Sequence, residues 1–299
     1  MTRKALNSGH DIKAGLFADE GLDDAVTCFE SDGYVVVPSL VPRQVVERMR
    51  RAFYELRSSE ALAGSRSSIW IQNVLEKQAH VVWLTASHPF VLRLLERLMG
   101  PFVQIESIVL AGFPPVPEEH AGSFSAWHRD RLFSPLPQDG VYSRPNVVVL
   151  MTYLQEQTGS VGPLRLLPRS HLLVSAIRPE DKHQPAPGEV LLTTQPGDCI
   201  LLHGNLLHSG TSNVSGDDRV MFGVTYNLTW MRQEDAFDGK VCQSLRSSAH
   251  ERGDHRHMRL LGEDRKLSRR LNSGAVVPGP TQWAGWCAED DADLFGAMS

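Results

Sequence analysis

The sequence contains few cysteines, and their spacing does not indicate a cross-linked or metal-stapled domain. Its 299 residues include four cysteines, and no two of them form a CxxC pair. A disulfide framework or a structural zinc site is recognised by closer and more regular spacing. We therefore expect reduced thiols in a cytoplasmic protein. The four residues are Cys28, Cys199, Cys242 and Cys287.

Long apolar runs and an excess of one charge are also absent. No stretch approaches the length that spans a bilayer. Residues 1–20 carry basic side chains without the apolar segment of a secretory signal. The net charge is −5 and the sequence pI is about 6.2, so composition indicates neither nucleic acid nor an anionic membrane as a partner. It gives no indication of the oligomeric state.

The first hundred residues combine helix signals with one short strand. Residues 23–32 indicate a helix, and the β-branched run Tyr34–Val37 follows it as a strand. Residues 42–59 begin with proline and repeat apolar side chains at helical spacing. Residues 88–100 show the same spacing and end in glycine, a common helix terminator. We therefore predict a helix-rich part over about residues 1–100.

From residue 103 onward the sequence changes to short β-rich runs separated by Pro, Gly, Asn and Asp. Many short strands with turn residues between them indicate a sandwich or a jelly roll. We therefore predict a mainly β core over about residues 101–230, with flanking helices. The runs are residues 103–113, 146–154, 162–168, 189–203 and 219–228.

After about residue 231 the β pattern weakens. Residues 247–274 indicate a charged helix or a solvated surface segment, and we expect the Trp-containing tail at residues 281–287 to pack back on the core. No internal repeat or long linker is evident, which predicts a single domain over residues 1–299 with residues 231–299 as a C-terminal extension. Three histidines stand among many charges here, so we interpret them as part of a solvated face and not as a second metal cluster. They are His250, His255 and His257.

The string SAWHRD, residues 125–130, places a histidine two residues before an aspartate. On an extended strand, residues two apart point to the same face, so His128 and Asp130 project together. Trp127, which we interpret as a packing residue, projects to the other side. An imidazole beside a carboxylate suits a borderline divalent metal such as Fe(II). The plain alternative is a surface pair, because two ligands alone are too few for tight binding.

A third ligand and an anion site are expected in residues 196–228. A predicted strand ends at His203, and His208 follows in a segment rich in Gly, Ser and Asn. Arg219 opens another strand, where an inward-pointing arginine is unfavourable unless it meets an anion such as a carboxylate. The plain alternative for Arg219 is a surface ion pair with one of the two aspartates before it. His203 competes with His208 as the third ligand, and packing explains a histidine at a strand end equally well.

The order of these motifs resembles the phytanoyl-CoA dioxygenase family of Fe(II)/2-oxoglutarate oxygenases. The chain has His128-x-Asp130, then His208, then Arg219 eleven residues further on. The resemblance spans about residues 25–230 and favours His208 as the third ligand because of this spacing. The matching text is FESDGYVVVPSLV near the N-terminus, GPLRLLPRSH at residues 162–171 and PGDCILLHGNLLHSGTSNVSGDDR at residues 196–219.

The resemblance implies a double-stranded β-helix, a cupin-like jelly roll, that forms one oxygenase domain. Fe(II) would be held by His128, Asp130 and His208, which also form the catalytic centre, and Arg219 would bind the far carboxylate of the co-substrate 2-oxoglutarate. The implied reaction uses O₂, yields succinate and CO₂, and hydroxylates, desaturates or rearranges a small molecule such as a specialised metabolite or an amino-acid derivative. Related halogenases lack the carboxylate ligand, so Asp130 argues against halogenation.

Further contacts to 2-oxoglutarate are implied at three residues. Many family members have a serine two residues after the distal histidine, where this chain has Gly210. A neighbouring hydroxyl, from Ser209 or Thr211, or a water is expected to take its place, and we include Thr211 in the site. Gln72 and Tyr153 come from regions that family members use for this purpose, and each also has a plain structural interpretation.

Two loops flank the metal strand, residues 114–123 and residues 131–145. Loops at the mouth of a rigid barrel usually determine specificity. Their mixture of aromatic and charged residues predicts a polar or amphipathic small molecule as the partner. The residues expected to contact it are Phe133, Tyr142 and Arg144.

Two other functions compete with the oxygenase interpretation. The first is a non-catalytic jelly-roll protein that binds a small molecule, and the second is a metal-dependent isomerase or hydrolase of cupin type. A binding module has no need of an open iron site, and a cupin hydrolase leaves Arg219 without a role. The sequence therefore favours the oxygenase.

Overall fold

The computed structural model describes residues 19–59, 67–130, 139–174, 177–274 and 279–296. The chain forms two compact units, and neither is continuous in sequence. The first unit comprises Met1–Ile71 and Val109–Gly223, and the second comprises Gln72–Ile108 and Val224–Ser299. The expected single domain over residues 1–299 stays a prediction.

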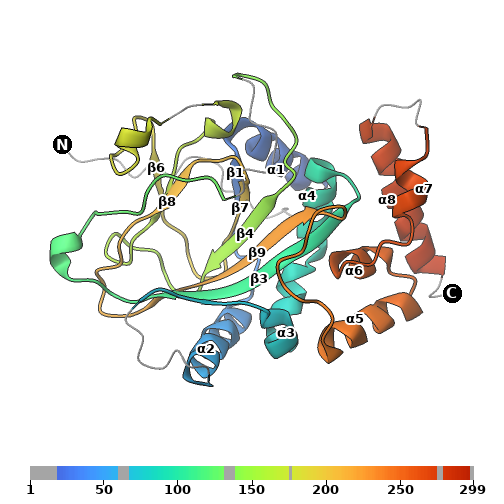
Figure 1. Ribbon diagram of the computed structural model, residues 1–299, viewed down its shortest axis with the longest axis horizontal. Helices are drawn as coiled ribbons and strands as arrows, with labels where there is room; N and C mark the ends of the chain where they lie inside the picture. The colour runs from blue at the N-terminus through green and yellow to red at the C-terminus, as the bar shows by residue number, and fades with distance from the viewer. Residues whose placement is uncertain (1–18, 60–66, 131–138, 175–176, 275–278, 297–299) are drawn as a thin grey trace. The chain divides into compact units, whose positions relative to one another are not determined.

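The larger of two sheets has six strands in the order β1-β7-β4-β9-β3-β2 (Figure 1). Strands β4 and β7 are antiparallel, with Val148 opposite His203, and so are β2 and β3, with Ile69 opposite Gly112. Every residue of β4 and β7 is buried, which explains their nearly continuous apolar sequence. The strands are β1 (Tyr34–Val37), β2 (Ile69–Ile71), β3 (Val103–Phe113), β4 (Val148–Tyr153), β7 (Cys199–His203) and β9 (Arg219–Leu228).

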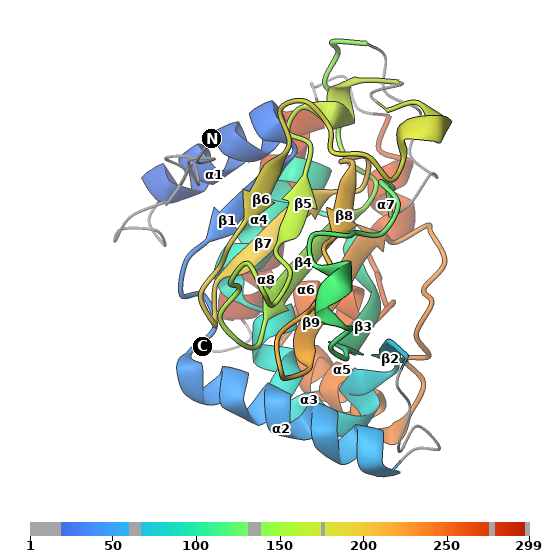
Figure 2. The same ribbon diagram turned by 90° about the vertical axis from the view of Figure 1, so that its left-hand side faces the viewer.

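The smaller sheet has three strands in the order β6-β5-β8, comprising Val190–Leu192, Leu164–Leu166 and His208–Gly210. Figure 2 shows this sheet in front of β1, β7 and β4. Its register places Leu166 opposite His208. Two antiparallel sheets facing each other form the expected jelly-roll core, and the predicted fold class is confirmed.

Two helices of the first unit match their sequence patterns. Helix α1 (Asp19–Asp32) contacts β1 and β7 and buries Phe29 completely. Helix α2 (Arg43–Ser59) buries Phe53, whose ring fills the space beside Gly112 of β3 so closely that a methyl group there would collide with it. Three short 3₁₀ turns complete this unit: η1 (Glu118–His120), η2 (Ser170–Leu172) and η3 (Pro179–Asp181).

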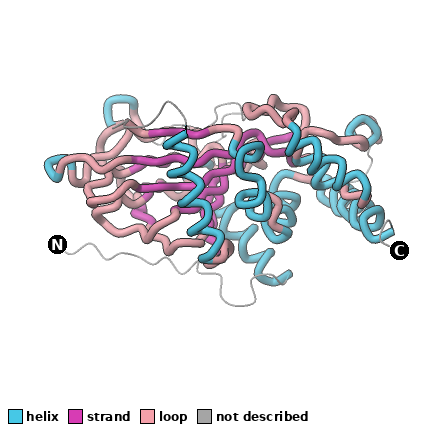
Figure 3. The backbone as a smooth tube through the Cα atoms, turned by 90° about the horizontal axis from the view of Figure 1, so that it is seen from below, coloured by secondary structure: helices cyan, strands magenta, loops and turns pink. Residues whose placement is uncertain are grey.

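The second unit is rich in helices, and Figure 3 shows that the C-terminal part of the chain is helical. Helix α4 begins at Pro89, where the His88 side chain accepts a hydrogen bond from the Phe90 amide at 3.2 Å. The aromatic tail packs within this unit, where the Trp283 ring lies against Gly100. No described helix is long and apolar enough to cross a membrane. The helices are α3 (Val74–Ala86), α4 (Pro89–Met99), α5 (Lys240–Glu251), α6 (His255–Leu260), α7 (Leu267–Leu271) and α8 (Gly279–Gly296).

Residues 247–274 were expected to form a charged helix or a solvated surface segment; much of the segment is helical, and the solvated alternative is wrong for Arg259 and Arg270. Arg259, Arg270 and Asp290 are each 2% exposed or less. Asp290 accepts from Arg270 Nη2 at 2.7 Å, from Arg259 Nη2 at 2.8 Å and from Lys266 Nζ at 3.1 Å. Burial alone would raise the pKa of Asp290, but the two guanidinium groups hold it well below its ordinary value. A buried ion network therefore joins α6, α7 and α8.

Replacing Asp290 with alanine should strongly destabilise the helical unit, because two buried guanidinium groups lose the fully buried carboxylate that they share. Each keeps one other acidic partner, Asp264 for Arg259 and Glu289 for Arg270. We expect the free energy of unfolding to fall by about 3–5 kcal/mol. Asp291 offers a matched control: its side chain is 50% exposed and pairs with Arg256, which keeps its second partner Glu96. Asp291→Ala should therefore cost less than about 1 kcal/mol. Urea denaturation followed by circular dichroism measures both, and equal losses would contradict the buried network.

Candidate active site

The SAWHRD segment is extended and lies against β8. An isolated bridge joins His128 to His208 of β8, and a second joins Phe124, just before the segment, to Thr211, just after the strand. The His128 amide donates to the His208 carbonyl at 3.1 Å, and the His208 amide donates back at 3.0 Å. The expected regular strand is therefore wrong in detail, but the extended backbone still lets His128 and Asp130 project together.

Serine side chains fix the register of this contact. The Ser209 hydroxyl donates to the Ser125 carbonyl at 2.5 Å, and the Gly210 amide donates to the Ser125 hydroxyl at 3.1 Å. The Ser125 amide donates in turn to the Gly210 carbonyl at 3.0 Å. A slip of one residue would break all three bonds, so these serines keep His128 opposite His208.

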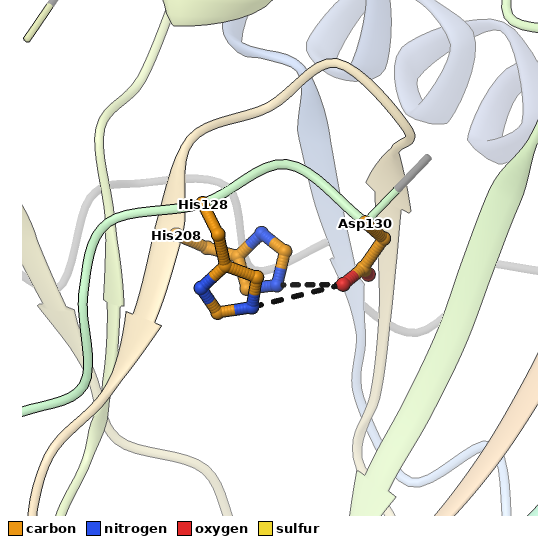
Figure 4. A group of neighbouring side chains, drawn as sticks. All are labelled: His128, Asp130 and His208. Atoms are coloured by element: carbon orange, nitrogen blue, oxygen red, sulfur yellow. Dashed lines mark ion pairs between the residues drawn. The ribbon is translucent and has the colours of Figure 1, made fainter. Parts of the chain in front are cut away.

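The three predicted metal ligands lie together (Figure 4). His208 Nε2 is 3.3 Å from Asp130 Oδ1, and His128 Nε2 is 3.8 Å from the same oxygen. The two imidazole centroids are 4.3 Å apart. Each residue offers one ligand atom, and these atoms lie within 4.8 Å of one another. Within the described ranges, no other His, Cys, Asp and Glu side chains form such a group.

Both imidazoles are oriented by their other nitrogen. His128 Nδ1 lies 2.8 Å from the Ala126 carbonyl, and His208 Nδ1 lies 3.0 Å from the Leu206 carbonyl. A carbonyl accepts but does not donate, so each Nδ1 carries a proton, and in the neutral ring Nε2, on the side of Asp130, is the unprotonated nitrogen. This is the tautomer that a metal ligand requires.

The surroundings of the two histidines differ in burial and charge. Burial lowers the pKa of His128, and the neighbouring His208 ring lowers it further. Burial also opposes a charge on His208, but the Asp130 carboxylate beside it raises the pKa of His208 above its ordinary value. The side chain of His208 is 7% exposed, that of Asp130 31% and that of His128 46%. The group is therefore covered on the side of His208 and open on the side of His128.

Arg219 is buried at the first position of β9. Its Nη1 donates to the carbonyls of Gly162 at 2.7 Å and Thr211 at 2.5 Å, and its guanidinium lies 4.7 Å from the centre of the Phe113 ring. Its Nε has no hydrogen-bond partner, and burial lowers the pKa of Arg219. Asp218, one candidate for a surface ion pair, binds Arg57 instead at 2.6 Å. Arg219 has no ion pair with a described acidic residue, which leaves room for an external anion.

Two glycines shape the space around this guanidinium. Gly162 has φ +86, and a methyl group there would meet Arg219 Nη1 at 2.6 Å and collide with the Thr211 carbonyl. At Gly210, which occupies the position of the family's serine, a methyl group would lie 3.6 Å from Arg219 Nη2. Gly162 therefore lets the backbone approach Arg219 closely, whereas a methyl group at position 210 would make an ordinary contact.

The structure brings two of the three further co-substrate candidates to Arg219. Tyr153 is 3% exposed, its pKa is raised by burial, and the charge of Arg219 acts on it in the opposite direction. The Thr211 hydroxyl is buried without a partner. Gln72 is exposed in the second unit and donates to Glu234 at 2.9 Å. Its predicted role with 2-oxoglutarate stays a prediction.

The predicted substrate residues are placed unevenly. Phe133 lies outside the described residues. Arg144 is exposed, and the Tyr142 hydroxyl is buried without a partner. The Tyr142 ring lies 6.1 Å from the ring of His171 and 6.2 Å from that of His203, measured between centroids. Their contact with a substrate stays a prediction.

The competing histidine is occupied elsewhere. His203 Nε2 lies 3.1 Å from the Ser143 carbonyl, and its Nδ1 accepts from the Asn205 amide at 3.0 Å. Burial lowers the pKa of His203 to about 4, so it is neutral at pH 7. Trp127 is buried and donates from Nε1 to the Gln184 carbonyl at 2.9 Å. Both residues are structural, in line with their plain interpretations.

The C-terminal histidines do not form a metal cluster. His255 pairs with Asp293 at 3.1 Å, and His257 pairs with Asp254 at 2.7 Å. His250 Nε2 contacts Arg265 Nη1 at 2.5 Å. Each histidine therefore has its own partner in the charged helical region.

Two features of the site were not predicted. The first is the pairing of Ser125 with Ser209, which the abundance of serine in both segments hints at. The second is Arg129, whose Nη2 donates to the carbonyls of Ser170 at 3.2 Å and Leu173 at 2.8 Å. Arg129 thereby anchors the residue before Asp130 to the segment that follows β5.

A jelly roll that brings two histidines and one carboxylate together, with a buried arginine that has no ion pair with a described acidic residue, is typical of a non-haem iron oxygenase. The model of the phytanoyl-CoA dioxygenase (PhyH) family matches residues 29–221. The chain belongs to this family and is an Fe(II)/2-oxoglutarate-dependent dioxygenase.

Individual relatives agree with this assignment. The chain is 23% identical to L-proline trans-4-hydroxylase of Streptomyces griseoviridis over 68% of its own length and 85% of the relative's. Its fold is similar to that of the non-heme alpha ketoglutarate dependent epimerase SnoN from nogalamycin biosynthesis, with TM-score 0.55, 21% identity and coverage of 70% and 82% of the two chains. HygX of Streptomyces hygroscopicus, solved with nickel and 2-oxoglutarate bound, gives TM-score 0.57, 16% identity and coverage of 70% and 88%.

Proposed function

We propose that His128, Asp130 and His208 hold the Fe(II) ion of this dioxygenase. The observation that carries the proposal is the convergence of two Nε2 atoms on one Asp130 oxygen, while both Nδ1 atoms are bound to backbone carbonyls. Two imidazoles and a carboxylate on one side of a metal form the facial arrangement that leaves the other positions open. The greater exposure of His128 agrees with an open side for substrate and O₂.

Arg219 and Thr211 are the proposed ligands of the far carboxylate of 2-oxoglutarate. The unpaired Arg219 Nε and the unpaired Thr211 hydroxyl supply two buried donors next to each other. Ser209 is a poorer substitute for the family's serine, because its hydroxyl already donates to the Ser125 carbonyl. Tyr153 is buried, interacts electrostatically with the same guanidinium and is proposed to line the co-substrate site.

The bound metal and 2-oxoglutarate supply the chemistry that inserts one atom of O₂ into a C–H bond, with succinate and CO₂ as the other products. The chain itself positions the metal ligands and the co-substrate and shields them from water. The Nδ1 bonds fix the imidazole orientation, Arg219 fixes one end of the co-substrate, and the buried face of His208 excludes water. Asp130 occupies the ligand position that a halide would need, so we propose hydroxylation and not halogenation.

The substrate is proposed to be a small amphipathic molecule, such as a specialised metabolite or an amino-acid derivative. The L-proline hydroxylase relative acts on an amino acid, and SnoN and HygX have been solved with nogalamycin RO and hygromycin B. In this chain, apolar side chains are exposed beside the segment that Arg129 anchors: Leu173 is 38% exposed, Val174 46% and Val141 55%. These exposed apolar side chains, with the charged Arg144, suit a ligand with apolar and polar parts.

The test is O₂-dependent turnover of 2-oxoglutarate by the purified protein. With Fe(II) present, we expect succinate to form and to increase when a true substrate is added from a panel of amino acids and glycosylated or polycyclic metabolites. A product heavier by one oxygen atom in mass spectrometry identifies the substrate. A non-catalytic binding protein or a cupin hydrolase would bind a panel member without forming succinate, and that result would overturn the proposal. The cytoplasmic location expected from the sequence stays a prediction.

A further inference from the structure

Several buried polar atoms without hydrogen-bond partners belong to Arg219 and to segments that hydrogen bonds link to it or to its neighbour Val220. Among the described residues, five side chains of the first unit contribute six such atoms. Proteins leave few buried polar atoms unpaired, and each one is unfavourable in an empty site. A group of them therefore points to a bound polar ligand. The atoms are Gln155 Nε2, Gln157 Nε2, Gln157 Oε1, Thr194 Oγ1, Thr211 Oγ1 and Arg219 Nε.

The loop over residues 154–162 lies between β4 and β5 and is bonded at both ends to Arg219 or to the residue after it. At its start, the Leu154 amide donates to the carbonyl of Val220, the residue after Arg219, at 2.9 Å. At its end, Arg219 Nη1 donates to the carbonyls of Val161 at 3.3 Å and Gly162 at 2.7 Å. Both ends of the loop are thus fixed to Arg219 or its neighbour, and Gln157 lies between them.

Gln157 and Thr194 are adjacent and deeply buried in this loop region. The backbone N–H of Gln157 donates to the backbone carbonyl of Thr194 at 3.0 Å. Gln157 is 2% exposed and Thr194 is 4% exposed. Gln155 differs from them, because its Oε1 accepts from the Val220 amide at 2.8 Å and so has a structural role. Neither polar atom of the Gln157 side chain has a comparable role within the described residues.

We propose that Gln157 and Thr194 are further ligands of the co-substrate and bind the far carboxylate of 2-oxoglutarate together with Arg219 and Thr211. The Gln157 amide nitrogen and the Thr194 hydroxyl are donors, and a carboxylate accepts up to about four hydrogen bonds through its two oxygens. These neutral donors add to the charge of Arg219 and make the pocket specific for a dicarboxylic 2-oxo acid. The inference rests on the proposed function, since it assigns additional residues to the same co-substrate.

The test compares two buried glutamines that differ in their partners. Gln104, also 2% exposed, donates from Nε2 to Asn227 at 2.9 Å and to the Met231 carbonyl at 2.8 Å. Gln157→Leu should leave the melting temperature of the ligand-free protein unchanged or raised, because an unpaired amide is removed. Gln104→Leu should lower it, because the partners of a satisfied amide become unpaired. Differential scanning fluorimetry without 2-oxoglutarate measures this contrast.

Binding of 2-oxoglutarate gives the second measurement, made anaerobically with Fe(II) by the ligand-induced rise in melting temperature. We expect Gln157→Leu to weaken the binding of 2-oxoglutarate by about 10- to 100-fold, as the loss of a hydrogen bond to a charged group predicts. Binding of 2-oxobutyrate, which has no far carboxylate, should be unchanged. Gln104→Leu should weaken the binding of neither 2-oxoglutarate nor 2-oxobutyrate. Thr194→Val, which keeps the side-chain shape, should weaken 2-oxoglutarate several-fold and covers the case in which Gln157→Leu does not fold.

The possible failures are distinguishable. If the wild-type protein binds 2-oxoglutarate and both variants bind it equally well, the assignment of Gln157 and Thr194 is wrong while the proposed function stands. An equal loss of 2-oxoglutarate and 2-oxobutyrate, with a lowered melting temperature, would show that the two residues are structural and would also overturn it. If the wild-type protein binds neither acid with Fe(II), the proposed function fails and this inference fails with it.

Discussion

Asp130→Ala and His208→Ala will each lower succinate formation to background. Each substitution removes one of three ligand atoms that lie within 4.8 Å of one another, and two ligands are too few to hold Fe(II) in place. The loss should be at least about 10³-fold, because several kcal/mol of transition-state stabilisation depend on the metal. Succinate released per enzyme under air, with Fe(II) and 2-oxoglutarate in excess, measures the effect.

A control must separate loss of a ligand from loss of a buried histidine. His203 is also buried, but it binds the Ser143 carbonyl and the Asn205 amide and does not join the metal group. His203→Gln keeps one donor and one acceptor, so we expect it to retain Fe(II) binding and turnover. Isothermal titration of Fe(II) under argon should show binding to this control and none to the two alanine variants. Turnover by Asp130→Ala at the wild-type rate would exclude Asp130 from the metal site.

Arg219→Leu will raise the concentration of 2-oxoglutarate required for half-maximal turnover by about 30-fold or more, as expected when one partner of a buried, hydrogen-bonded charge pair is removed. The guanidinium has no acidic partner among the described residues, and its Nε is unpaired, so the external carboxylate is its expected counter-ion. The effect should appear in KM for 2-oxoglutarate much more than in KM for the organic substrate. Initial rates at varied 2-oxoglutarate measure it.

Arg57 provides the matched control for this experiment. It lies on α2 and pairs with Asp218, the residue next to Arg219, at 2.6 Å. Arg57→Gln removes a cationic group from the same neighbourhood without touching the pocket, and KM for 2-oxoglutarate should stay unchanged. An unchanged KM in Arg219→Leu would remove Arg219 from the co-substrate site. Equal increases in both variants would indicate a general loss of positive charge in place of a specific contact.

Local sequence patterns were sufficient for most elements of the core. The strand Tyr34–Val37 agrees residue for residue, because one tyrosine and three valines, residue types that favour strands, follow a helix and a glycine with φ +83. The helix at Arg43–Ser59 and the long strands β3 and β9 agree for similar reasons. In each case the pattern lies within one continuous segment, and burial of one face or both follows from it.

The candidate site was predictable in its residues and less so in its geometry. The spacing of His128 and Asp130 correctly brings them together on one side. The segment that carries them is not a regular strand, because its contact with β8 depends on residues 84 apart in sequence, Ser125 and Ser209. No local pattern can show which distant hydroxyls will meet. The unpaired atoms of Gln157 are equally hidden from sequence, since they are defined by the absence of partners in the folded chain.

The burial of the charged C-terminal residues could not be predicted from the sequence. A run rich in Arg, Asp and Glu predicts a solvated face, because charged residues are rarely buried. Arg270 is nevertheless almost completely buried, since Asp290, twenty residues away, supplies two carboxylate oxygens to it. Sequence reveals the charges but not the pairing that permits their burial.

The most direct test of the central assignment is an anaerobic titration of the purified protein with Fe(II) and 2-oxoglutarate, followed by visible absorption. Chelation of the 2-oxo acid to Fe(II) in a site formed by His128, Asp130 and His208 should give a weak charge-transfer band. The band should be absent in Asp130→Ala and present in His203→Gln. A wild-type protein without this band, or an Asp130→Ala variant that keeps it, would contradict the assignment of these three residues as the iron site.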